Sequence, residues 1–441
     1  MRLTTNVSQD LSAAVRAVEQ RFTDANPLSH AQHQRARRVL PGGNARQTLY
    51  YSPFPLTVVR GKDGHVTDLD GHTYLNLVGE YAASVYGHSC EPIHDAVRSC
   101  LTGGLSLSGM NSAEVELAEL ISARFPSMEQ VRFCNSGSEA CLLAALLARH
   151  ATGRRSLLVL RGCYHGGFMN YGDSDSPLSV PFETVKATYN DVAGTRAALR
   201  ANGTSIAAVL VEPVMGAGGC IPGTREFLSM LRDETRKLGI VLVFDEVMTS
   251  RLGSGGVQGE IGIAPDLTTL GKFWGGGFAF GAFGGAKSLM CHFDVIGGGT
   301  LSHAGTFNNN IMAMTAGLVG ARDVYTSEVC ADTNRRGDWL RAELNDLGCQ
   351  MDIAFQATGL GAVLNMHWRS EPISNPGDVE PPNSPMRRLF QLEMLLRGYY
   401  VTQRGMITLA LPTTEQDLQG YLGAVADYMT SYQAFLPKRA R

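Results

Sequence analysis

A lysine and two acids each stand at the end of a short apolar run, where α/β proteins often place their chemistry. These residues and the runs before them are Glu212 (206–211), Asp245 (240–244) and Lys272 (266–270). Ligands of open α/β sheets bind outside the carboxyl ends of the strands, so we expect the three side chains in one crevice. An amine placed there can form a Schiff base with a carbonyl compound, and an acid beside it can hold a proton.

The surroundings of Lys272 are unusual for a solvated lysine. It stands between Gly271 and Phe273, and Trp274 and three glycines follow. We interpret Lys272 as a catalytic amine, with a purely structural lysine as the alternative. Asp245 is interpreted as a catalytic acid, although the residue pattern alone fits a helix cap or an ion pair at a strand end equally well.

A candidate anion site lies further upstream. The turn Ser136–Gly137–Ser138 precedes an almost wholly apolar helix predicted over 140–151. Free backbone N–H groups, the positive end of the helix dipole and two hydroxyls attract an anion, and we expect a phosphate. The serines could also be simple helix caps. After the predicted strand 156–160, Tyr164 stands among glycines, an arrangement that suits a flat ring.

These features together match the needs of a carbonyl cofactor bound as a Schiff base: an amine, an acid against a pyridine nitrogen, a phosphate cradle and a support for the ring. Other functions are disfavoured. Lys272 lacks the spacing of a P-loop, the glycines of 253–256 lack the opening strand of a dinucleotide turn, and no GxSxG elbow occurs. His165 and His303 lack metal-ligand spacing, so we expect no metal.

The elements that must position these residues follow a βαβ pattern. From about 130 to 290, short apolar runs alternate with amphipathic runs, which predicts a mostly parallel sheet. The clearest unit is a strand at 206–211, a helix at 224–238 and a strand at 240–244.

The two ends of the chain lack this pattern. We therefore expect a large sheet domain over 66–320, with a smaller α+β domain built from residues 1–65 and 321–441. The segment Arg369–Pro385 holds five prolines and is predicted to be an extended loop, either an exposed excursion or a lid.

Composition limits the class of protein. Of 441 residues, 44% are hydrophobic and 18% charged, so the chain is expected to fold around a sizeable core. The net charge of -3 offers no basic field for nucleic acid or for an anionic membrane, which favours a small-molecule partner. Nine cysteines without a CxxC pair and the lack of a signal peptide or apolar span lead us to expect a cytoplasmic enzyme.

Six ordered motifs make the sequence resemble the class III pyridoxal-phosphate aminotransferases, the ω-aminotransferase group, over most of its length. They are NSGSEA (135–140), CYHGG (163–167), VEP (211–213), FDEVMTS (244–250), TLGKFWGGG (269–277) and HAGTFNNN (303–310). Within the family, PGGNAR (41–46) and YSPFPL (51–56) are most similar to the β-phenylalanine aminotransferases. Many members carry a glycine-rich turn where this chain has Thr249–Ser250–Arg251–Leu252, and the departure favours the β-amino acid branch.

The resemblance implies fold type I of the PLP-dependent transferases, pyridoxal 5'-phosphate as cofactor, and a homodimer with shared active sites. Lys272 would bind the cofactor and move a proton, Asp245 would pair with the pyridine nitrogen, and Tyr164 would stack on the ring. The implied cofactor-binding residues are Ser136, Gly137, Ser138, Tyr164, His165, Glu212, Asp245, Val247, Lys272 and, from the neighbouring subunit, Thr306.

Two arginines resemble carboxylate-binding residues of the same branch. Arg46 would take the carboxylate of a β-amino acid, and Arg404 the α-carboxylate of 2-oxoglutarate, pyruvate or an α-amino acid; either could instead be a solvated surface arginine. The expected activity is ping-pong transfer of the amino group of a β-amino acid, such as β-phenylalanine, to an α-keto acid. The alternatives are a glutamate-1-semialdehyde-type aminomutase and a general ω-amine transaminase.

Overall fold

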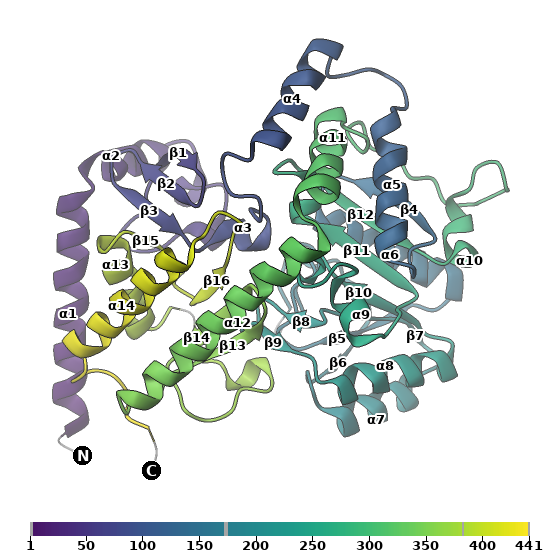
Figure 1. The fold of residues 1–441 in the computed structure, drawn as a ribbon. Coiled ribbons are helices and arrows are strands. Elements are labelled where there is room, and N and C mark those ends of the chain that lie inside the picture. The colour runs from purple at the N-terminus through teal and green to yellow at the C-terminus, as the bar shows by residue number, and fades with distance from the viewer. Residues whose placement is uncertain (1–2, 172–174, 382, 440–441) are drawn as a thin grey trace.

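The structure, a computed structural model, describes residues 3–171, 175–381 and 383–439. Figure 1 shows two lobes, one built around a large sheet and the other from both ends of the chain. In the described residues the large sheet has seven strands. Their order is β4 (Gln130–Cys134), β12 (Gly281–Gly285), β11 (Leu267–Gly271), β10 (Val241–Asp245), β7 (Ile206–Val211), β5 (Ser156–Leu160) and β6 (Thr184–Ala187).

The large sheet is mostly parallel, as the sequence predicts. Pairs β11–β10, β10–β7, β7–β5 and β5–β6 are parallel, and β12 runs antiparallel to both of its neighbours. The strands β5, β7, β10 and β11 are buried along their whole length, which explains their nearly continuous apolar sequences.

Helix α6 (Gly137–Thr152) crosses the middle of the large sheet and contacts β7, β10, β11 and β12. Its buried residues Ala140, Ala144 and Ala148 are small, so the helix lies close to the strands. The predicted start at residue 140 is three residues late, because Ser136 caps the helix and the presumed turn is its first turn. Helix α8 (Arg225–Leu238) matches the prediction, with a Thr224 cap and left-handed Gly239 after it.

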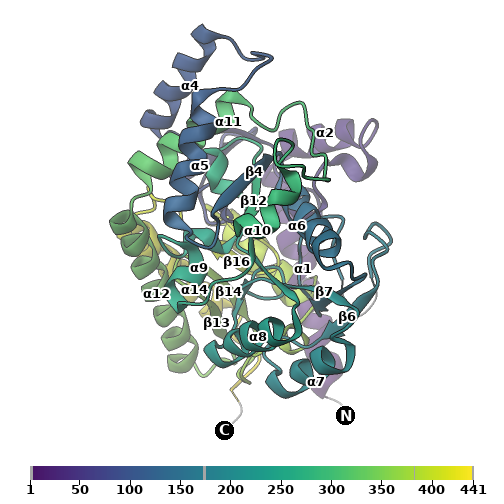
Figure 2. The ribbon, with the colours of Figure 1, turned by 90° about the vertical axis from the view of Figure 1, so that its right-hand side faces the viewer.

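The other helices of this lobe surround the sheet (Figure 2). They are α4 (Glu91–Gly103), α5 (Ser112–Arg124), α7 (Val192–Asn202), α9 (Gly256–Ile261), α10 (Lys287–Met290) and α11 (Ile311–Val319). Helix α7 packs beside α8, while α11 contacts both α4 and α5. None of the described helices is long and apolar enough to cross a membrane.

The second lobe contains two small sheets. One has the order β1 (Val58–Lys62), β2 (His65–Asp68), β3 (Thr73–Asn76), β15 (Tyr399–Tyr400), and the other β13 (Gln356–Leu360), β14 (Val363–His367), β16 (Met406–Thr408). The helices around them are α1 (Leu3–Ala25), α2 (Pro27–Ala36), α12 (Ser327–Gln350), α13 (Pro385–Leu396) and α14 (Glu415–Ser431). Both chain ends contribute to its core, in which Phe22, Leu77 and Tyr421 are fully buried.

The division at residues 65 and 320 stays a prediction. Strand β2 pairs with β1 and with β3, and β3 pairs with β15 from the C-terminal part of the chain. Because Tyr74 and Leu77 belong to the core of the second lobe, the packing favours a boundary close to residue 77.

The proline-rich segment is held in place within its described parts, 369–381 and 383–385. Pro376 lies against Gly162 and Gly218 of the sheet lobe, and Asn190 donates a hydrogen bond of 2.9 Å to the carbonyl of Ser374. A short 3-10 helix, Pro376–Asp378, interrupts the predicted extended loop. Two short strands, β8 (Val214–Met215) and β9 (Ile221–Pro222), lie nearby, and the segment bridges the two lobes.

Candidate active site

The structure brings the three predicted strand-end residues together. Strands β7, β10 and β11 are adjacent and parallel, so Asp245, the last residue of β10, and Glu212 and Lys272, directly after β7 and β11, lie at one edge of the sheet. The negative charges of both acids act on the amine, because each raises the pKa of Lys272. The three residues therefore lie close together, as expected from the sequence, and of the three only Lys272 lines a cavity described below.

Lys272 is held in an unusual backbone conformation. Its φ of 56° is left-handed, and its Nζ donates a hydrogen bond to the backbone carbonyl of Tyr81. Desolvation outweighs the two neighbouring acids and lowers the pKa of Lys272 to about 8. An amine with such a pKa is partly unprotonated near neutral pH, as a nucleophile that attacks a carbonyl must be.

Asp245 is surrounded by hydrogen-bond donors. Its Oδ2 receives His165 Nδ1 at 2.8 Å and the Cys141 thiol at 3.2 Å, while Oδ1 receives the Val247 amide at 3.0 Å and the Thr269 hydroxyl at 3.3 Å. Burial, the largest single effect, would raise its pKa, but the hydrogen bond and charge of His165, with the hydrogen bonds from Val247 and Cys141, together hold the pKa of Asp245 below its usual range. The carboxylate therefore stays ionised and can face a cationic ring nitrogen.

His165 is buried, 1% exposed, and its second ring nitrogen, Nε2, has no hydrogen-bond partner among the described residues. Burial opposes its protonation, but Cys163 and Asp245 outweigh burial and raise its pKa well above the usual value. Ligand atoms of Cys141, His165 and Asp245 lie within 4.8 Å of one another, as in a metal site. Because the three are already joined by hydrogen bonds, we assign the cluster to the positioning of Asp245.

Glu212 connects the sheet to Tyr164. One of its carboxylate oxygens accepts the backbone N–H of Tyr164 and the other accepts that of Gly216, both at 2.9 Å. Its pKa is raised to about 7. Burial is the main cause, the charge of His165 lowers the pKa, and the charge of Asp245 raises it. Tyr164 is 45% exposed, so it is not packed into the core and can contact a flat cofactor.

The start of α6 has the form of a phosphate cradle. Ser136 caps the helix, and its hydroxyl accepts the Glu139 amide at 3.2 Å, so the cap role considered above is also present. The backbone is closely surrounded here, since a Cβ at Gly137 would lie 2.6 Å from Val247 and one at Gly166 would lie 2.3 Å from the Ser138 hydroxyl. Together with the unpartnered His165 nitrogen, this arrangement fits a phosphorylated pyridine.

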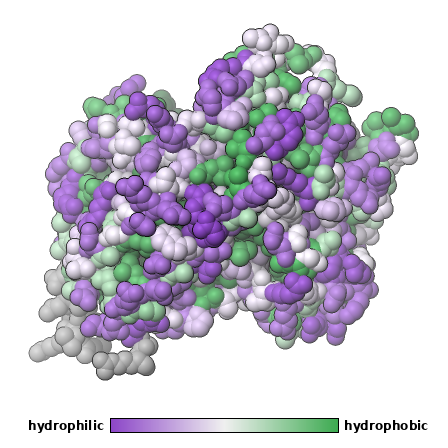
Figure 3. Space-filling view, in the orientation of Figure 1, coloured by the Kyte–Doolittle hydropathy of each residue, from purple (hydrophilic) through white to green (hydrophobic). Residues whose placement is uncertain are grey.

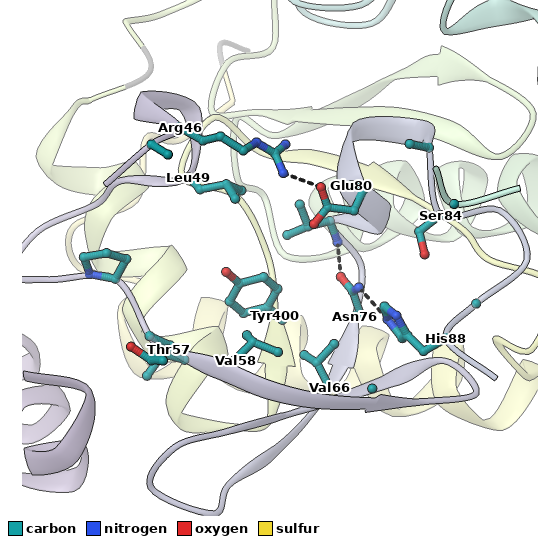
Figure 4. Close-up of a pocket in the computed structure, with 18 of the residues that line it drawn as sticks. Arg46, Leu49, Thr57, Val58, Val66, Asn76, Glu80, Ser84, His88 and Tyr400 are labelled. Carbon is teal, nitrogen blue, oxygen red and sulfur yellow. Dashed lines mark hydrogen bonds and ion pairs between the residues drawn. The ribbon is translucent and has the colours of Figure 1, made fainter. Parts of the chain in front are cut away.

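A cavity of about 970 Å³ opens beside Lys272 (Figure 4). It is lined by residues from both lobes, including Arg46, Leu49, Asn76, Glu80, Tyr400 and the glycines 276–277. Arg46 forms an ion pair with Glu80 across the cavity wall. The structure thus brings one of the two predicted carboxylate-binding arginines into the cavity of the lysine.

Arg404 lies in a neighbouring, smaller cavity of about 170 Å³. Its guanidinium stacks over the ring of Tyr81, with 5.5 Å between Cζ and the ring centroid. Leu49, Val78 and Tyr400 line both cavities and form the wall between them. The structure does not bring Arg404 into the cavity that contains Lys272.

Thr306 lies outside the site of its own chain. It is exposed, in the loop before α11, and lines neither described cavity near Lys272. Its predicted contact would have to be made to another copy of the chain.

Four neighbours of the site were not found from the sequence. Cys141 and Thr269 bind the carboxylate of Asp245, while Glu80 and Tyr81 contact Arg46, Lys272 and Arg404. Glu80 and Tyr81 belong to a short turn, α3 (Gly79–Ala82), that carries no motif. The only available signal was Gly79 before an acid and an aromatic residue, a pattern too common to identify a site.

Comparison with known proteins gives the family. The model of the family aminotransferase class-III matches residues 48–408, and the chain belongs to this family. A beta-phenylalanine transaminase of Variovorax paradoxus is 44% identical over 98% of this chain and 98% of its own. The solved beta-phenylalanine aminotransferase of that organism has a TM-score of 0.96, at 44% identity over 98% of this chain and all of its own.

A solved transaminase with PLP bound is 28% identical, with a TM-score of 0.84 over 92% of this chain and 97% of that one. The chain is therefore a class III aminotransferase with the fold of the PLP-dependent enzymes, and its cofactor is pyridoxal 5'-phosphate. The roles of the individual residues stay predictions.

Proposed function

We propose that the enzyme moves the amino group of a β-amino acid, an aromatic one such as β-phenylalanine, to an α-keto acid such as 2-oxoglutarate or pyruvate in a ping-pong cycle. The observation that carries the proposal is that Arg46 and Lys272 line one cavity, so that a carboxylate and an amine of one substrate have separate partners. The identity with a beta-phenylalanine transaminase over nearly the whole chain supports the same substrate class.

Pyridoxal phosphate, when bound, supplies a ring that withdraws electrons from the substrate carbon as its proton leaves. In our proposal Lys272 takes and returns that proton, and its pKa of about 8 suits both directions near neutral pH. The ionised Asp245 keeps a proton on the ring nitrogen, while Tyr164 and Val247 hold the two ring faces. The phosphate is assigned to the residues at the start of α6: Ser136, Gly137 and Ser138.

Arg404 is proposed to hold the α-carboxylate of the keto-acid acceptor. Its guanidinium now stacks on Tyr81 in the smaller cavity, so the side chain must swing past that ring to meet an acceptor beside Lys272. An arginine with two positions would let one site accept carboxylates at two distances from the amine.

We further propose a homodimer in which Thr306 of each copy contacts the phosphate of the other. Supporting it, Thr306 is exposed, and apolar side chains gather on the projecting loop after α10, where Val295 and Ile296 are 82% and 96% exposed (Figure 3). Adjacent apolar side chains with so much exposed surface fit a loop that packs against another copy of the chain. All nine cysteines are free thiols, which supports a reducing compartment such as the cytoplasm.

The visible absorption of the loaded enzyme tests the reaction. Addition of 3-amino-3-phenylpropanoate should bleach the yellow band, and 2-oxoglutarate should restore it. The variant Arg46→Ala should lose turnover of this β-amino acid while keeping that of 1-phenylethylamine, which has no carboxylate. Equal loss for both substrates would refute the role of Arg46, and turnover of an amino donor without any added keto acid would indicate an aminomutase.

A further inference from the structure

The turn α3 connects the three charged groups that matter for substrate binding. Glu80 forms the ion pair with Arg46, the Tyr81 carbonyl accepts Lys272 Nζ, and the Tyr81 ring carries Arg404. These contacts come from two consecutive residues. Any substrate that reaches both Lys272 and Arg46 must therefore meet this turn.

The backbone of the turn is left-handed over four residues, with φ of 49° at Gly79, 51° at Glu80, 52° at Tyr81 and 76° at Ala82. Such a run is unfavourable for residues other than glycine, so the surrounding contacts must impose it. Thr408 approaches so closely that a Cβ at Gly79 would lie 2.2 Å from its hydroxyl.

Further hydrogen bonds fix the entry to the turn. The side-chain carbonyl of Asn76 accepts the amides of Val78 and Gly79, both at 3.1 Å, and Thr408 donates to the Val78 carbonyl at 2.9 Å. The Tyr81 hydroxyl donates to the Thr48 carbonyl, next to the segment that carries Arg46. These hydrogen bonds hold the backbone of the turn, and Figure 4 shows the carboxylate of Glu80 pointing toward Arg46.

The Glu80–Arg46 ion pair itself is weakly protected. The two side chains are 50% and 47% exposed, and exposed ion pairs contribute little free energy. A second carboxylate with good geometry can therefore replace Glu80 on the guanidinium. The charges of both members of the pair act on Lys272, since Arg46 lowers and Glu80 raises the pKa of Lys272.

We propose that Glu80 is a specificity-determining residue: it occupies Arg46 as an internal carboxylate while the site is empty and gives way to the carboxylate of a bound substrate. The inference rests on the proposed role of Arg46. It follows that Glu80 weakens the binding of every carboxylate substrate that uses Arg46. Amines without a carboxylate leave the ion pair intact, so Glu80 should not affect their binding.

The test compares Glu80→Gln, which keeps the length of the side chain, with the loaded wild-type enzyme. The KM for 3-amino-3-phenylpropanoate should fall about two- to fivefold, the factor expected for removal of an exposed ion pair, with kcat retained. The KM for 1-phenylethylamine should not change. The dissociation constant of 3-phenylpropanoate, which lacks the amine, should fall by the same factor in a calorimetric titration.

A matched control is Glu116→Gln, because Glu116 also forms a half-exposed ion pair, with Arg322, at side-chain exposures of 51% and 49%. This control should leave unchanged the KM and kcat for 3-amino-3-phenylpropanoate, the KM for 1-phenylethylamine and the Kd of 3-phenylpropanoate. An unchanged or raised KM for the β-amino acid in Glu80→Gln, or a parallel change for 1-phenylethylamine, would overturn the inference.

Failure of the proposed function would look different. If the wild-type enzyme does not turn over the β-amino acid, the proposed function is wrong, and the titration with 3-phenylpropanoate still decides about Glu80. Tighter binding in Glu80→Gln would support its competition for Arg46, and equal binding would exclude it. The double variant with Arg46→Ala should abolish the difference in either case.

Discussion

Replacement of Glu212 by Gln should remove a dependence of folding stability on pH in the cofactor-free chain. Burial raises the pKa of Glu212 from its ordinary 4.5 to about 7. Between these pH values the folded chain holds a proton that the unfolded chain has lost, so stability falls as the pH rises from 4.5 to about 7. The difference between the two pKa values corresponds to about 3 kcal/mol of unfolding free energy at neutral pH.

The side chain introduced by Glu212→Gln cannot ionise, but it offers one acceptor oxygen to the two amides that Glu212 serves, those of Tyr164 and Gly216. Losing one such hydrogen bond costs about 1 kcal/mol at every pH. At pH 4.5 the variant should therefore be less stable than the wild type. Above pH 7 the wild type has lost about 3 kcal/mol through ionisation of Glu212 and the variant about 1 kcal/mol through the lost hydrogen bond, so the variant should be more stable by about 2 kcal/mol. The two curves should cross between about pH 5 and 6.

Urea unfolding of both proteins, followed by tryptophan fluorescence from pH 4.5 to 8, measures this crossing. Other groups also titrate in this range, since the pKa of Glu246 is raised from 4.5 and that of His367 is lowered from 6.5, but both proteins share them and the difference between the curves removes most of their effect. The lowered pKa of Asp245 acts below its ordinary 3.8, and that of Lys272 acts between about 8 and 10.5. The raised pKa of His165 adds a loss of stability above 6.5, which the difference between the proteins largely removes. Parallel curves would refute the buried, raised-pKa description of Glu212.

Three further predictions concern the cofactor site. Gly166→Ala should lower the free energy of unfolding by about 2 kcal/mol or more and weaken PLP binding, because the φ of Gly166 is 106° and a Cβ there would meet Ser138. The control Gly167→Ala has open space around the added Cβ and should change neither property. Urea unfolding and PLP titration measure the two effects. Attachment of PLP to Lys272, trapped with borohydride and followed by mass spectrometry, should speed up to about pH 8 and then level off, while an ordinary lysine would continue toward about pH 10. Cys141→Ala should raise the apparent pKa of the acid limb of PLP binding, and Cys141→Ser, which keeps a donor, should not.

The parts of the fold that follow from local sequence were predicted well. The strand 206–211 and the helix that ends before Gly239 have the expected bounds, because a fully buried strand needs a continuous apolar run and a left-handed glycine ends a helix. The predicted start of α6 was three residues late because Gly137 and Ser138 are polar or flexible in sequence but helical under a serine cap. The sequence therefore predicted that these helices and strands exist, whereas their first and last residues depended on capping contacts.

The candidate site divides in the same way. The strand-end residues could be predicted because adjacency of parallel strands brings their carboxyl ends together without any knowledge of side-chain contacts. The contact of Lys272 with Tyr81 spans 191 positions, and it depends on a left-handed turn that Asn76 and Thr408, from other elements, stabilise. No local pattern encodes such a contact.

The position of Arg404 likewise depends on a contact between residues that are far apart in the sequence. The resemblance to the β-amino acid branch identified Arg404, but that resemblance does not show which cavity the guanidinium enters. In the structure the guanidinium stacks on Tyr81 in the smaller cavity. Arg46, in contrast, is in the larger cavity but is already paired with Glu80. Both predicted carboxylate-binding arginines are thus in contact with adjacent residues of one turn. If the arginines have the proposed roles, a substrate carboxylate must displace those contacts. On the proposed roles of Arg46 and Arg404, selectivity between carboxylates would depend on α3 as well as on the two arginines.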